Sequence, residues 1–306
     1  MVAVEDIRNS FQGRIELGES MARHMTFRIG GTADIYLEPL DKEDGLSLFR
    51  FLAKADIPYV LIGNGSNVLI ADKGIRGAVV NLETGFNYLR AVDGEIIAGA
   101  GVKLAKFVDF CINNKCGGAE MLAGIPGTLG GAIIMNAGAY GGEISDYIMR
   151  VDLIRDLNLL SIKKDDGGFA YRASALVGDI VLEAAFRFPE GVLEPMKQRR
   201  RELLLKRNAS QPVNWPNAGS IFKNPLDDYA ARLIQECGLK GRRVGGAQIS
   251  ELHANFIINV DNASAQDVLD LMVIARDAVT DKFGITLEPE IKLIGFTKEE
   301  MTPVVS

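Results

Sequence analysis

The sequence predicts an α+β fold built in two parts, and three observations support this prediction. Before residue 190, short apolar runs typical of strands outnumber amphipathic helices, which argues against a regular doubly wound sheet. A strongly charged helix expected over 193–207 resembles a connector. The chain after it changes character, with one long amphipathic helix and a closing alternating strand. We therefore expect a boundary near residues 190–205.

The first part is expected to hold two amphipathic helices among several short strands. Apolar residues at helical spacing predict helices over 41–55 and 102–114. Apolar runs predict strands at 58–62, 68–70, 78–82, 95–100, 151–154 and 180–188. Since the strand at 58–62 leads through a turn into another strand, the turn does not open a dinucleotide-binding helix of the Rossmann type.

The second part is expected to alternate helices with short strands. The sequence predicts a helix over 228–237 ended by Gly238, a buried strand over 254–259, and a helix over 265–283 capped by Ser264 with Asp267. The last strand, 285–294, alternates strictly. Its apolar face holds Ile285, Leu287, Pro289, Ile291 and Leu293, and its polar face holds Thr286, Glu288, Glu290 and Lys292.

Composition limits the class of protein. The 306 residues are 47% hydrophobic and 24% charged, with a net charge of −6, so nucleic acid is not expected as the main partner. Three cysteines in no framework spacing and two histidines indicate a reduced, cytosolic protein without a metal site. The first 12 residues carry charges and no apolar core, so no signal peptide is expected there.

Glycine is concentrated in two places. Nine of the 26 residues from Gly117 to Gly142 are glycine, and the turn Gly63–Asn67 reads GNGSN. The stretch 121–142 is uncharged, but its glycines and Pro126 make it a poor membrane-spanning helix. Glycine lets backbone approach a ligand closely, so both places are candidates for holding a dinucleotide. The alternatives are a plain turn at 63–67 and a buried irregular loop at 124–142.

A set of ordered strings resembles one enzyme family. The strings are TFRIGG at 26–31, GNGSN at 63–67, GIPGTLGGAIIMNAGAYGGEI at 124–144, FAYRAS at 169–174, AGSIFKNP at 218–225, GLKG at 238–241, HANFIIN at 253–259 and LEPEI at 287–291. In this order they resemble the UDP-N-acetylenolpyruvoylglucosamine reductases (MurB). The spacing of 47 residues between Arg172 and Ser220 resembles the shorter class of that family, which lacks an extra substrate-capping loop.

The resemblance implies a fold and an organisation. It implies an FAD-binding region of the vanillyl-alcohol-oxidase type over residues 1–200, with subdomains at about 20–75 and 76–190. A smaller α+β substrate domain would follow over 201–306, with Glu290 on its last strand.

The resemblance also implies an activity and its site. Hydride would pass from NADPH to non-covalent FAD and then to the enolpyruvyl ether of UDP-N-acetylglucosamine, in bacterial peptidoglycan synthesis in the cytoplasm. No protein partner, nucleic acid or membrane is implied. The catalytic candidates are Arg172 for the substrate carboxylate, Ser220 as proton donor and Glu290 as second acid. The cofactor candidates are Gly63, Asn64, Gly65, Ser66, Asn67, Gly124, Pro126, Gly127, Thr128, Gly130, Gly131, Asn136 and Gly138. The substrate candidates are Tyr171, Lys223 and Asn224.

Several alternatives stay open at this stage. Another flavoenzyme, such as a hydroxy-acid or alcohol dehydrogenase, and a nucleotide-binding protein without catalysis are the competing functions. His253 is as compatible with a structural role as with a ligand contact. The run Lys197–Arg207 is compatible with a solvated connector and with an approach to a nucleotide.

Overall fold

The computed structural model describes residues 4–305 and divides into two compact units. Unit 1 consists of Met1–Glu16, Ile35–Asn64 and Gly77–Lys206, and unit 2 of Leu17–Asp34, Gly65–Arg76 and Arg207–Ser306. Residues 1–3 and 306 lie outside the described part, so the expectation about the N-terminus falls partly outside it. Each unit is assembled from three stretches of chain, so these compact units are defined differently from the contiguous cofactor and substrate regions that the resemblance implies.

Helices and strands alternate irregularly along the described chain. The helices are α1 (Val4–Ser10), α2 (Lys42–Lys54), α3 (Leu104–Asn113), α4 (Leu129–Ile134), α5 (Leu193–Ser210), α6 (Ala230–Glu236), α7 (Ala265–Phe283) and α8 (Lys298–Val305). Short 3₁₀ helices are η1 (Met21–Arg23), η2 (Ala119–Leu122), η3 (Ile144–Tyr147) and η4 (Lys164–Gly167). The strands are β1 (Arg14–Ser20), β2 (Thr32–Glu38), β3 (Tyr59–Leu61), β4 (Val68–Ile70), β5 (Ile75–Val80), β6 (Leu89–Val92), β7 (Glu95–Gly99), β8 (Gly138–Ala139), β9 (Gly142–Glu143), β10 (Ile148–Arg155), β11 (Asn158–Lys163), β12 (Ile180–Phe186), β13 (Arg243–Val244), β14 (Ala247–Ile249), β15 (Ile257–Asn259) and β16 (Lys292–Ile294).

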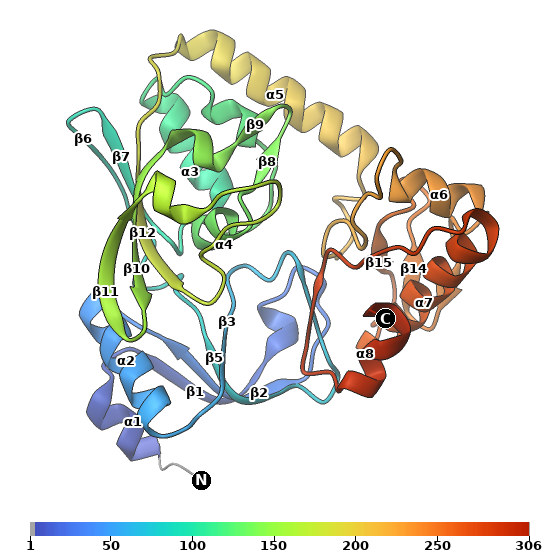
Figure 1. The fold of residues 1–306 in the computed structure, drawn as a ribbon, viewed down its shortest axis with the longest axis horizontal. Helices are drawn as coiled ribbons and strands as arrows, with labels where there is room; N and C mark the ends of the chain where they lie inside the picture. The colour runs from blue at the N-terminus through green and yellow to red at the C-terminus, as the bar shows by residue number, and fades with distance from the viewer. Residues whose placement is uncertain (1–3, 306) are drawn as a thin grey trace. The chain divides into compact units, whose positions relative to one another are not determined.

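Unit 1 is organised by a five-stranded antiparallel sheet with the order β11-β10-β12-β7-β6. α4 packs against β7 and β12, and α3 packs against α4 and η2 (Figure 1). Every residue of β12 is buried, which fits a central strand covered on both faces. The rings of Phe107 and Phe186 meet at 4.8 Å in the core between helix and sheet. This packing holds α4, which is part of the glycine-rich stretch, against the sheet.

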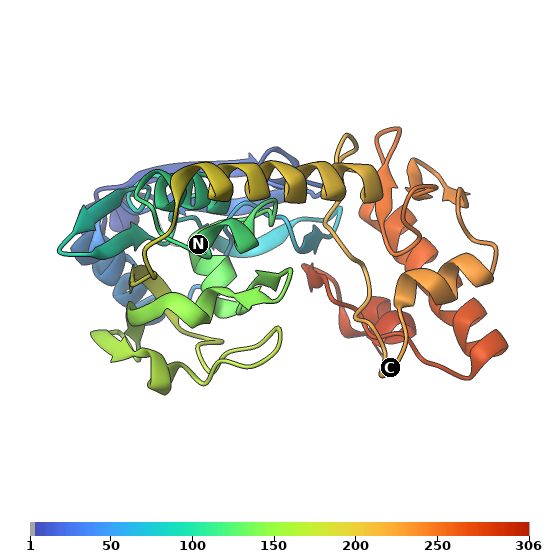
Figure 2. The ribbon, with the colours of Figure 1, turned by 90° about the horizontal axis from the view of Figure 1, so that it is seen from above.

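A four-stranded sheet, with the order β1-β2-β5-β3, contains three of the five places where the chain passes between the units. The division falls inside β1, β2 and β5. Within unit 1, β3 pairs in parallel with β5, so that Tyr59 lies opposite Ala78. The chain changes unit again at Lys206, near the end of α5. α5 itself is one unbroken helix (Figure 2), and Met196 is its buried side chain.

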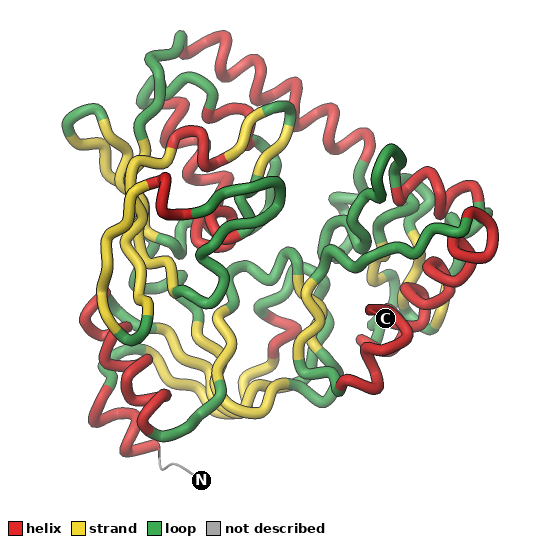
Figure 3. The backbone as a smooth tube through the Cα atoms, viewed as in Figure 1, coloured by secondary structure: helices red, strands yellow, loops and turns green. Residues whose placement is uncertain are grey.

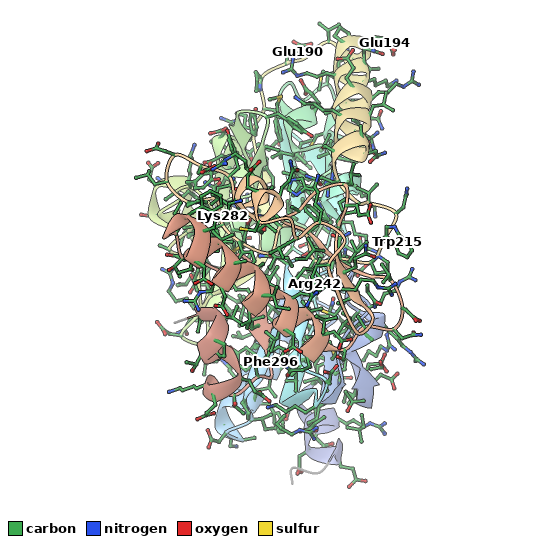
Figure 4. All side chains as sticks on the ribbon, turned by 90° about the vertical axis from the view of Figure 1, so that its right-hand side faces the viewer. Glu190, Glu194, Trp215, Arg242, Lys282 and Phe296 are labelled. Atoms are coloured by element: carbon green, nitrogen blue, oxygen red, sulfur yellow. The ribbon has the colours of Figure 1, made fainter. Side chains whose placement is uncertain are left out.

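Unit 2 has its own core around α7. The antiparallel sheet β13-β14-β15 packs against this helix through β13 and β14, and α6 and α8 also pack on it. Figure 4 shows α7 as the long helix of this unit, with Lys282 near its C-terminal end. Ser264 and Asp267 form the expected capping box at its start, and Gly284 ends it with a φ of 67°. β16 joins the unit by pairing in parallel with β4.

The α+β class is confirmed, and so are most of the expected elements. The helix expected at 265–283 and the strand at 68–70 have the predicted bounds. The strand expected over 285–294 is wrong in length, since regular pairing is confined to Lys292–Ile294. Pro289 has no N–H and takes part only in an isolated bridge with Phe222. Burial agrees with the predicted apolar and polar faces at three positions. Leu287 and Ile291, expected on the apolar face, are buried, and Glu288, expected on the polar face, is exposed.

Residues 124–142 are not the continuous irregular loop that one interpretation expected, because they contain α4 and β8. None of the described helices is long and apolar enough to cross a membrane. Residues 4–305 also contain no group of three or more His, Cys, Asp or Glu side chains arranged to hold a metal ion.

Candidate functional site

The turn Gly63–Asn67 follows β3 and leads into β4, and the division between the units falls between Asn64 and Gly65. Gly63 is required by packing, because a Cβ there would collide with the side chain of Thr128. Gly65 is buried and has a φ of 59°, in the left-handed region that favours glycine. Its carbonyl oxygen accepts a bond of 3.2 Å from the Thr26 hydroxyl. Both glycines therefore have structural reasons that do not depend on a ligand.

The three polar side chains of this turn differ in their bonding. Asn64 and Ser66 are half-buried, and neither side chain has a hydrogen-bond partner within residues 4–305. Asn67 is committed to the protein, because its Nδ2 donates to the carbonyl oxygen of Glu290 at 3.3 Å and its own carbonyl accepts from the Lys292 N–H at 2.9 Å. Asn64 and Ser66 are thus the members available to a ligand, whereas Asn67 holds the segment that carries Glu290.

The glycine-rich stretch around α4 offers a similar contrast. The N–H of Gly130 donates to the carbonyl of Ala100 at 2.8 Å, and a Cβ at Gly130 would lie 3.0 Å from the Cβ of Ala100. At Gly131 a Cβ would meet only the Thr128 hydroxyl, at 3.7 Å. That hydroxyl belongs to a buried residue, yet nothing in the described chain hydrogen-bonds to it. The structure therefore has space beside Gly131, and the Thr128 hydroxyl next to this space has no hydrogen-bond partner in the described chain.

The remaining cofactor candidates on this stretch serve its backbone. Gly124 and Gly127 have φ values of 81° and 123°, conformations that side chains rarely adopt, and Pro126 lies between them. The carbonyl of Gly127 accepts from the N–H of Leu104 at the start of α3, at 2.9 Å. These residues therefore set the shape of the backbone before α4.

Asn136 is fully buried, and its side chain is hydrogen-bonded to neighbouring segments of unit 1. Its Nδ2 donates to Glu143 Oε2 at 2.7 Å and to the carbonyl of Ala170 at 3.0 Å, and its Oδ1 accepts from the Ser145 N–H. Its φ of 44° lies in the left-handed region, which asparagine tolerates better than most residues. The structure thus uses this amide to tie β8 and β9 to the segment before Arg172.

Arg172 lies on a tight turn of unit 1. Ala170 and Ala173 exchange backbone bonds of 3.0 and 3.1 Å across it, which sets Arg172 at a φ of 55°. Its NH1 donates to the carbonyl of Gly138 at 2.8 Å, and its guanidinium lies 5.4 Å from the ring of Tyr171. Tyr171 is 76% exposed. Arg172 is half-buried, and its guanidinium is hydrogen-bonded at one nitrogen, which leaves its other N–H groups for an anion.

Ser220 lies in unit 2, in the loop that follows α5 and is drawn mainly green in Figure 3. Asn255 binds the two residues after it. The N–H of Ile221 donates to the Asn255 carbonyl at 2.9 Å, the N–H of Phe222 donates to Asn255 Oδ1 at 3.0 Å, and Asn255 Nδ2 donates to the Phe222 carbonyl at 2.8 Å. The Ser220 hydroxyl itself has no hydrogen-bond partner in the described chain. In the sequence, Asn255 is one residue of the string HANFIIN, and nothing there assigned it a role.

Glu290 pairs with the other edge of the same segment. Its N–H donates to the Ile221 carbonyl at 2.8 Å, and the N–H of Lys223 donates to the Glu288 carbonyl at 2.8 Å. The ammonium of Lys223 forms an exposed ion pair of 3.1 Å with Glu288. Asn224 uses Oδ1 to accept from the Ala230 N–H at the start of α6, at 3.2 Å. The structure of unit 2 thus brings Ser220, Lys223 and Glu290 onto two paired pieces of backbone.

The sequence left open the roles of His253 and of the basic run Lys197–Arg207, and the structure shows the surroundings of both. The Nδ1 of His253 is buried without a partner in the described chain, and burial, with the nearby charge of Lys240, lowers the pKa of this imidazole. The ring packs edge-on against Phe256 at 4.8 Å. In the basic run of α5, Arg200 forms an ion pair of 2.6 Å with Asp109. Neither observation assigns a ligand to these residues.

Two family models match parts of the chain. Residues 33–157 match an FAD binding domain, and residues 211–294 match the C-terminal domain of UDP-N-acetylenolpyruvoylglucosamine reductase. The first match covers Gly63–Asn67 and the glycine-rich stretch. The second covers Ser220, Asn255 and Glu290.

Similar whole proteins carry the same reductase name. A UDP-N-acetylenolpyruvoylglucosamine reductase of Chloroherpeton thalassium is 46% identical over 97% of this chain and 99% of its own length. One of Caldanaerobacter subterraneus is 42% identical over 93% of this chain and 95% of its own length. The crystal structure of the reductase (MurB) from Thermus caldophilus matches with a TM-score of 0.77 and 33% identity, covering 92% of this chain and 99% of that one.

Proposed function

The chain belongs to the UDP-N-acetylenolpyruvoylglucosamine reductase family, whose members are FAD-dependent oxidoreductases, and we propose how its own residues carry out the reaction. NADPH is the proposed reductant, and the enolpyruvyl ether of UDP-N-acetylglucosamine is reduced to UDP-N-acetylmuramate, a precursor of peptidoglycan. The competing interpretation as a dehydrogenase of hydroxy acids or alcohols finds no support among these relatives.

The observation that best supports the catalytic assignment is the pairing of backbone in unit 2. The bond of 2.8 Å from the Glu290 N–H to the Ile221 carbonyl sets Glu290 beside the residue that follows Ser220. A proton donor and a second acid are both needed near the carbon that becomes negatively charged. The paired segments around Ser220 and Glu290 would therefore provide both the proton donor and the second acid.

The residues of unit 1 fit a bound FAD. A Cβ at Gly131 would enter open space beside Thr128, and the side chains of Thr128 and Asn64 have polar atoms that no described residue uses. We propose that these residues, with Ser66 and the backbone of Gly124–Gly131, hold the cofactor without a covalent bond, since neither stretch contains His or Cys. When bound, FAD supplies the hydride that reaches the outer vinyl carbon of the substrate.

The protein side chains then have three tasks. Arg172 binds the substrate carboxylate through N–H groups that Gly138 does not occupy. Ser220 donates its proton to the inner carbon, where negative charge develops as hydride arrives at the outer carbon. Glu290 stabilises that charge as the second acid. Tyr171, Lys223 and Asn224 are proposed to contact the rest of the nucleotide sugar.

We also propose the organisation and location that the family implies. Residues 1–200 bind the cofactor and residues 201–306 bind the substrate. Because the nucleotide-sugar substrate and the reductant are soluble metabolites of the bacterial cytoplasm, the enzyme would act there. Cell fractionation followed by immunoblotting tests the location.

Anaerobic stopped-flow spectroscopy tests the proposed reaction in two steps. Mixing the holoenzyme with NADPH should bleach the flavin absorbance, and adding the enolpyruvyl substrate should restore it with formation of one UDP-N-acetylmuramate per flavin. A flavin that NADPH does not reduce, or that the enolpyruvyl substrate does not reoxidise, would contradict the proposal. Reduction by a hydroxy acid in place of NADPH would support the competing dehydrogenase.

A further inference from the structure

We propose that Asn255 is a positioning residue that fixes the backbone after Ser220 and so sets where the Ser220 hydroxyl lies during proton transfer. This inference rests on the proposed role of Ser220 as proton donor. It concerns a residue that touches neither the substrate nor the cofactor in the proposed reaction. It acts through the peptide groups of Ile221 and Phe222.

The side-chain bonding of Asn255 uses both a donor and an acceptor, as only an amide can provide here. The residue is 3% exposed. Its Oδ1 accepts from the Phe222 N–H and its Nδ2 donates to the carbonyl of the same residue, at 3.0 and 2.8 Å. Its main-chain carbonyl accepts from the Ile221 N–H at 2.9 Å. A carboxylate would keep the acceptor and lose the donor, and an apolar side chain would leave two backbone groups of Phe222 without partners.

The opposite edge of the segment is fixed as well. The Ile221 carbonyl accepts from the Glu290 N–H, and the Lys223 N–H donates to the Glu288 carbonyl, both at 2.8 Å. Residues 221–223 therefore lie between Asn255 on one side and 288–290 on the other. We call the three hydrogen bonds between Asn255 and residues 221 and 222 the Asn255 clamp. The clamp holds the segment that follows Ser220 in its pairing with the segment that carries Glu290.

Ser220 combines a fixed backbone with a hydroxyl that has no partner. On its N-terminal side Gly219 has a φ of 79°, and its N–H donates to Asn217 Oδ1 at 2.9 Å. On its C-terminal side the Asn255 clamp begins. A weak acid such as serine transfers its proton only from the correct position, and displacements of about 1 Å reduce rates by about 100-fold. The clamp is placed where it would prevent such a displacement.

Asn255→Asp tests the clamp in the holoenzyme. The ionised carboxylate would face the Phe222 carbonyl oxygen without a proton to donate. We expect reoxidation by the enolpyruvyl substrate to slow by about 100-fold, whereas flavin reduction by NADPH and the KM for the substrate change less than about threefold. As the pH falls and the carboxyl gains a proton, the donor returns, so the reoxidation rate should recover. Asn214→Asp, at an exposed asparagine of the same unit, is the matched control.

Hydrogen exchange provides a readout that does not depend on activity. In the wild-type protein, the amides of Ile221 and Phe222 should exchange more slowly than those amides of the loop 211–224 that have no acceptor in the described chain. In Asn255→Asp both amides keep their acceptors, but repulsion between the ionised carboxylate and the Phe222 carbonyl should loosen this segment, so both amides should exchange faster at neutral pH. Fast exchange of both amides in the wild type would overturn the proposal even if the variant failed to fold.

The kinetic outcomes separate this inference from the proposed function. Equal slowing of both half-reactions in Asn255→Asp would show a general structural role and overturn the positioning role. Normal reoxidation in a folded variant would overturn it as well. Failure of the wild-type enzyme to turn over the enolpyruvyl substrate would instead contradict the proposed function, while leaving the exchange measurement intact.

Discussion

The backbone N–H of Glu290 donates a hydrogen bond of 2.8 Å to the carbonyl oxygen of Ile221. This bond joins two segments that are far apart in the sequence and places the proposed second acid beside the residue after Ser220. Asn67 supports the same arrangement, because its Nδ2 donates to the Glu290 carbonyl. Since both peptide groups of Glu290 are bonded, its position depends on the backbone, and a change of its side chain should leave the position intact.

Replacement of Glu290 by glutamine is expected to separate chemistry from structure. Glu290→Gln keeps the backbone bonds and loses the acid, so reoxidation by the enolpyruvyl substrate should slow by about 100-fold or more. Glu288→Gln is the matched control on the same segment, because Glu288 is exposed and pairs only with Lys223 in the described chain. Rapid-mixing measurements of both variants decide the assignment. A larger loss in Glu288→Gln would mean that the wrong glutamate has been chosen.

Replacement of Arg172 by lysine is expected to weaken binding of the enolpyruvyl carboxylate. A lysine keeps the charge but cannot bind a carboxylate with two parallel N–H groups. The kcat/KM for the enolpyruvyl substrate should fall by about 10- to 100-fold, with flavin reduction by NADPH unchanged. Arg187→Lys, at an exposed arginine paired with Glu95, should have little effect. Steady-state kinetics at varied substrate concentration would expose an error if Arg172→Lys kept its kcat/KM.

Two adjacent glycines of α4 are expected to respond differently to alanine. In Gly130→Ala the new Cβ would lie 3.0 Å from the Ala100 Cβ, so the fold itself should lose stability. In Gly131→Ala the methyl group would enter the space assigned to the cofactor, so FAD affinity should fall. The apoprotein of Gly131→Ala should be as stable as wild type or about 0.5–1 kcal/mol more stable, because alanine favours the helix. FAD titration and thermal unfolding of both apoproteins give the answer, and normal FAD binding by Gly131→Ala would exclude this wall.

An ion-pair network in unit 1 is expected to make stability depend on pH. Burial alone would raise the pKa of Asp152, but hydrogen bonds from Lys42 and Ser161 outweigh it and lower this pKa below its usual value. Lys42 Nζ lies 2.8 Å from Asp152 and 3.3 Å from Glu183. A carboxyl with a lowered pKa in the folded state stabilises the protein above the pKa of the unfolded chain, and this contribution disappears as the pH falls through the folded-state pKa.

Lys42→Met should therefore destabilise the protein by about 1–2 kcal/mol near pH 7, and by less below about pH 4. Lys54→Met, at an exposed lysine of the same helix, is the control. Urea unfolding at pH 7 and pH 3.5 measures both. A loss of stability in Lys42→Met that does not shrink at low pH would show that the effect comes from packing and not from the charge.

Local patterns in the sequence predicted those elements whose stability is itself local. α7 has the predicted bounds because helical spacing, the Ser264 capping box and a terminal glycine all agree. β1 was not predicted, since the charges of RIELGES interrupt any apolar alternation and its residues are half-buried or exposed. α4 was hidden by Gly130 and Gly131, which disfavour helices in isolation. Its start is held by the long-range bond from Gly130 to Ala100.

The candidate site shows the same limit. Glycine content indicated the region that we propose for the cofactor, but only the structure separates Gly63 and Gly130, which packing explains, from Gly131, which it does not. Asn255 carries no local signal, because its three bonds all go to residues 33 or 34 positions earlier in the chain. The catalytic candidates came from resemblance to a family, and composition alone would not have found them.

The half-reactions of Ser220→Ala test the central claim most directly. Without the hydroxyl no side chain is assigned to protonate the inner carbon, so reoxidation by the enolpyruvyl substrate should slow by about 100- to 10,000-fold. In Ser220→Ala, the rate of flavin reduction by NADPH should match that of the wild type. The control is Ser210→Ala, at an exposed serine at the end of α5. This control should match the wild type in both half-reactions. Anaerobic stopped-flow mixing of reduced Ser220→Ala with the substrate should leave the flavin reduced on the wild-type timescale. Reoxidation at the wild-type rate would contradict the assignment of Ser220 as the proton donor.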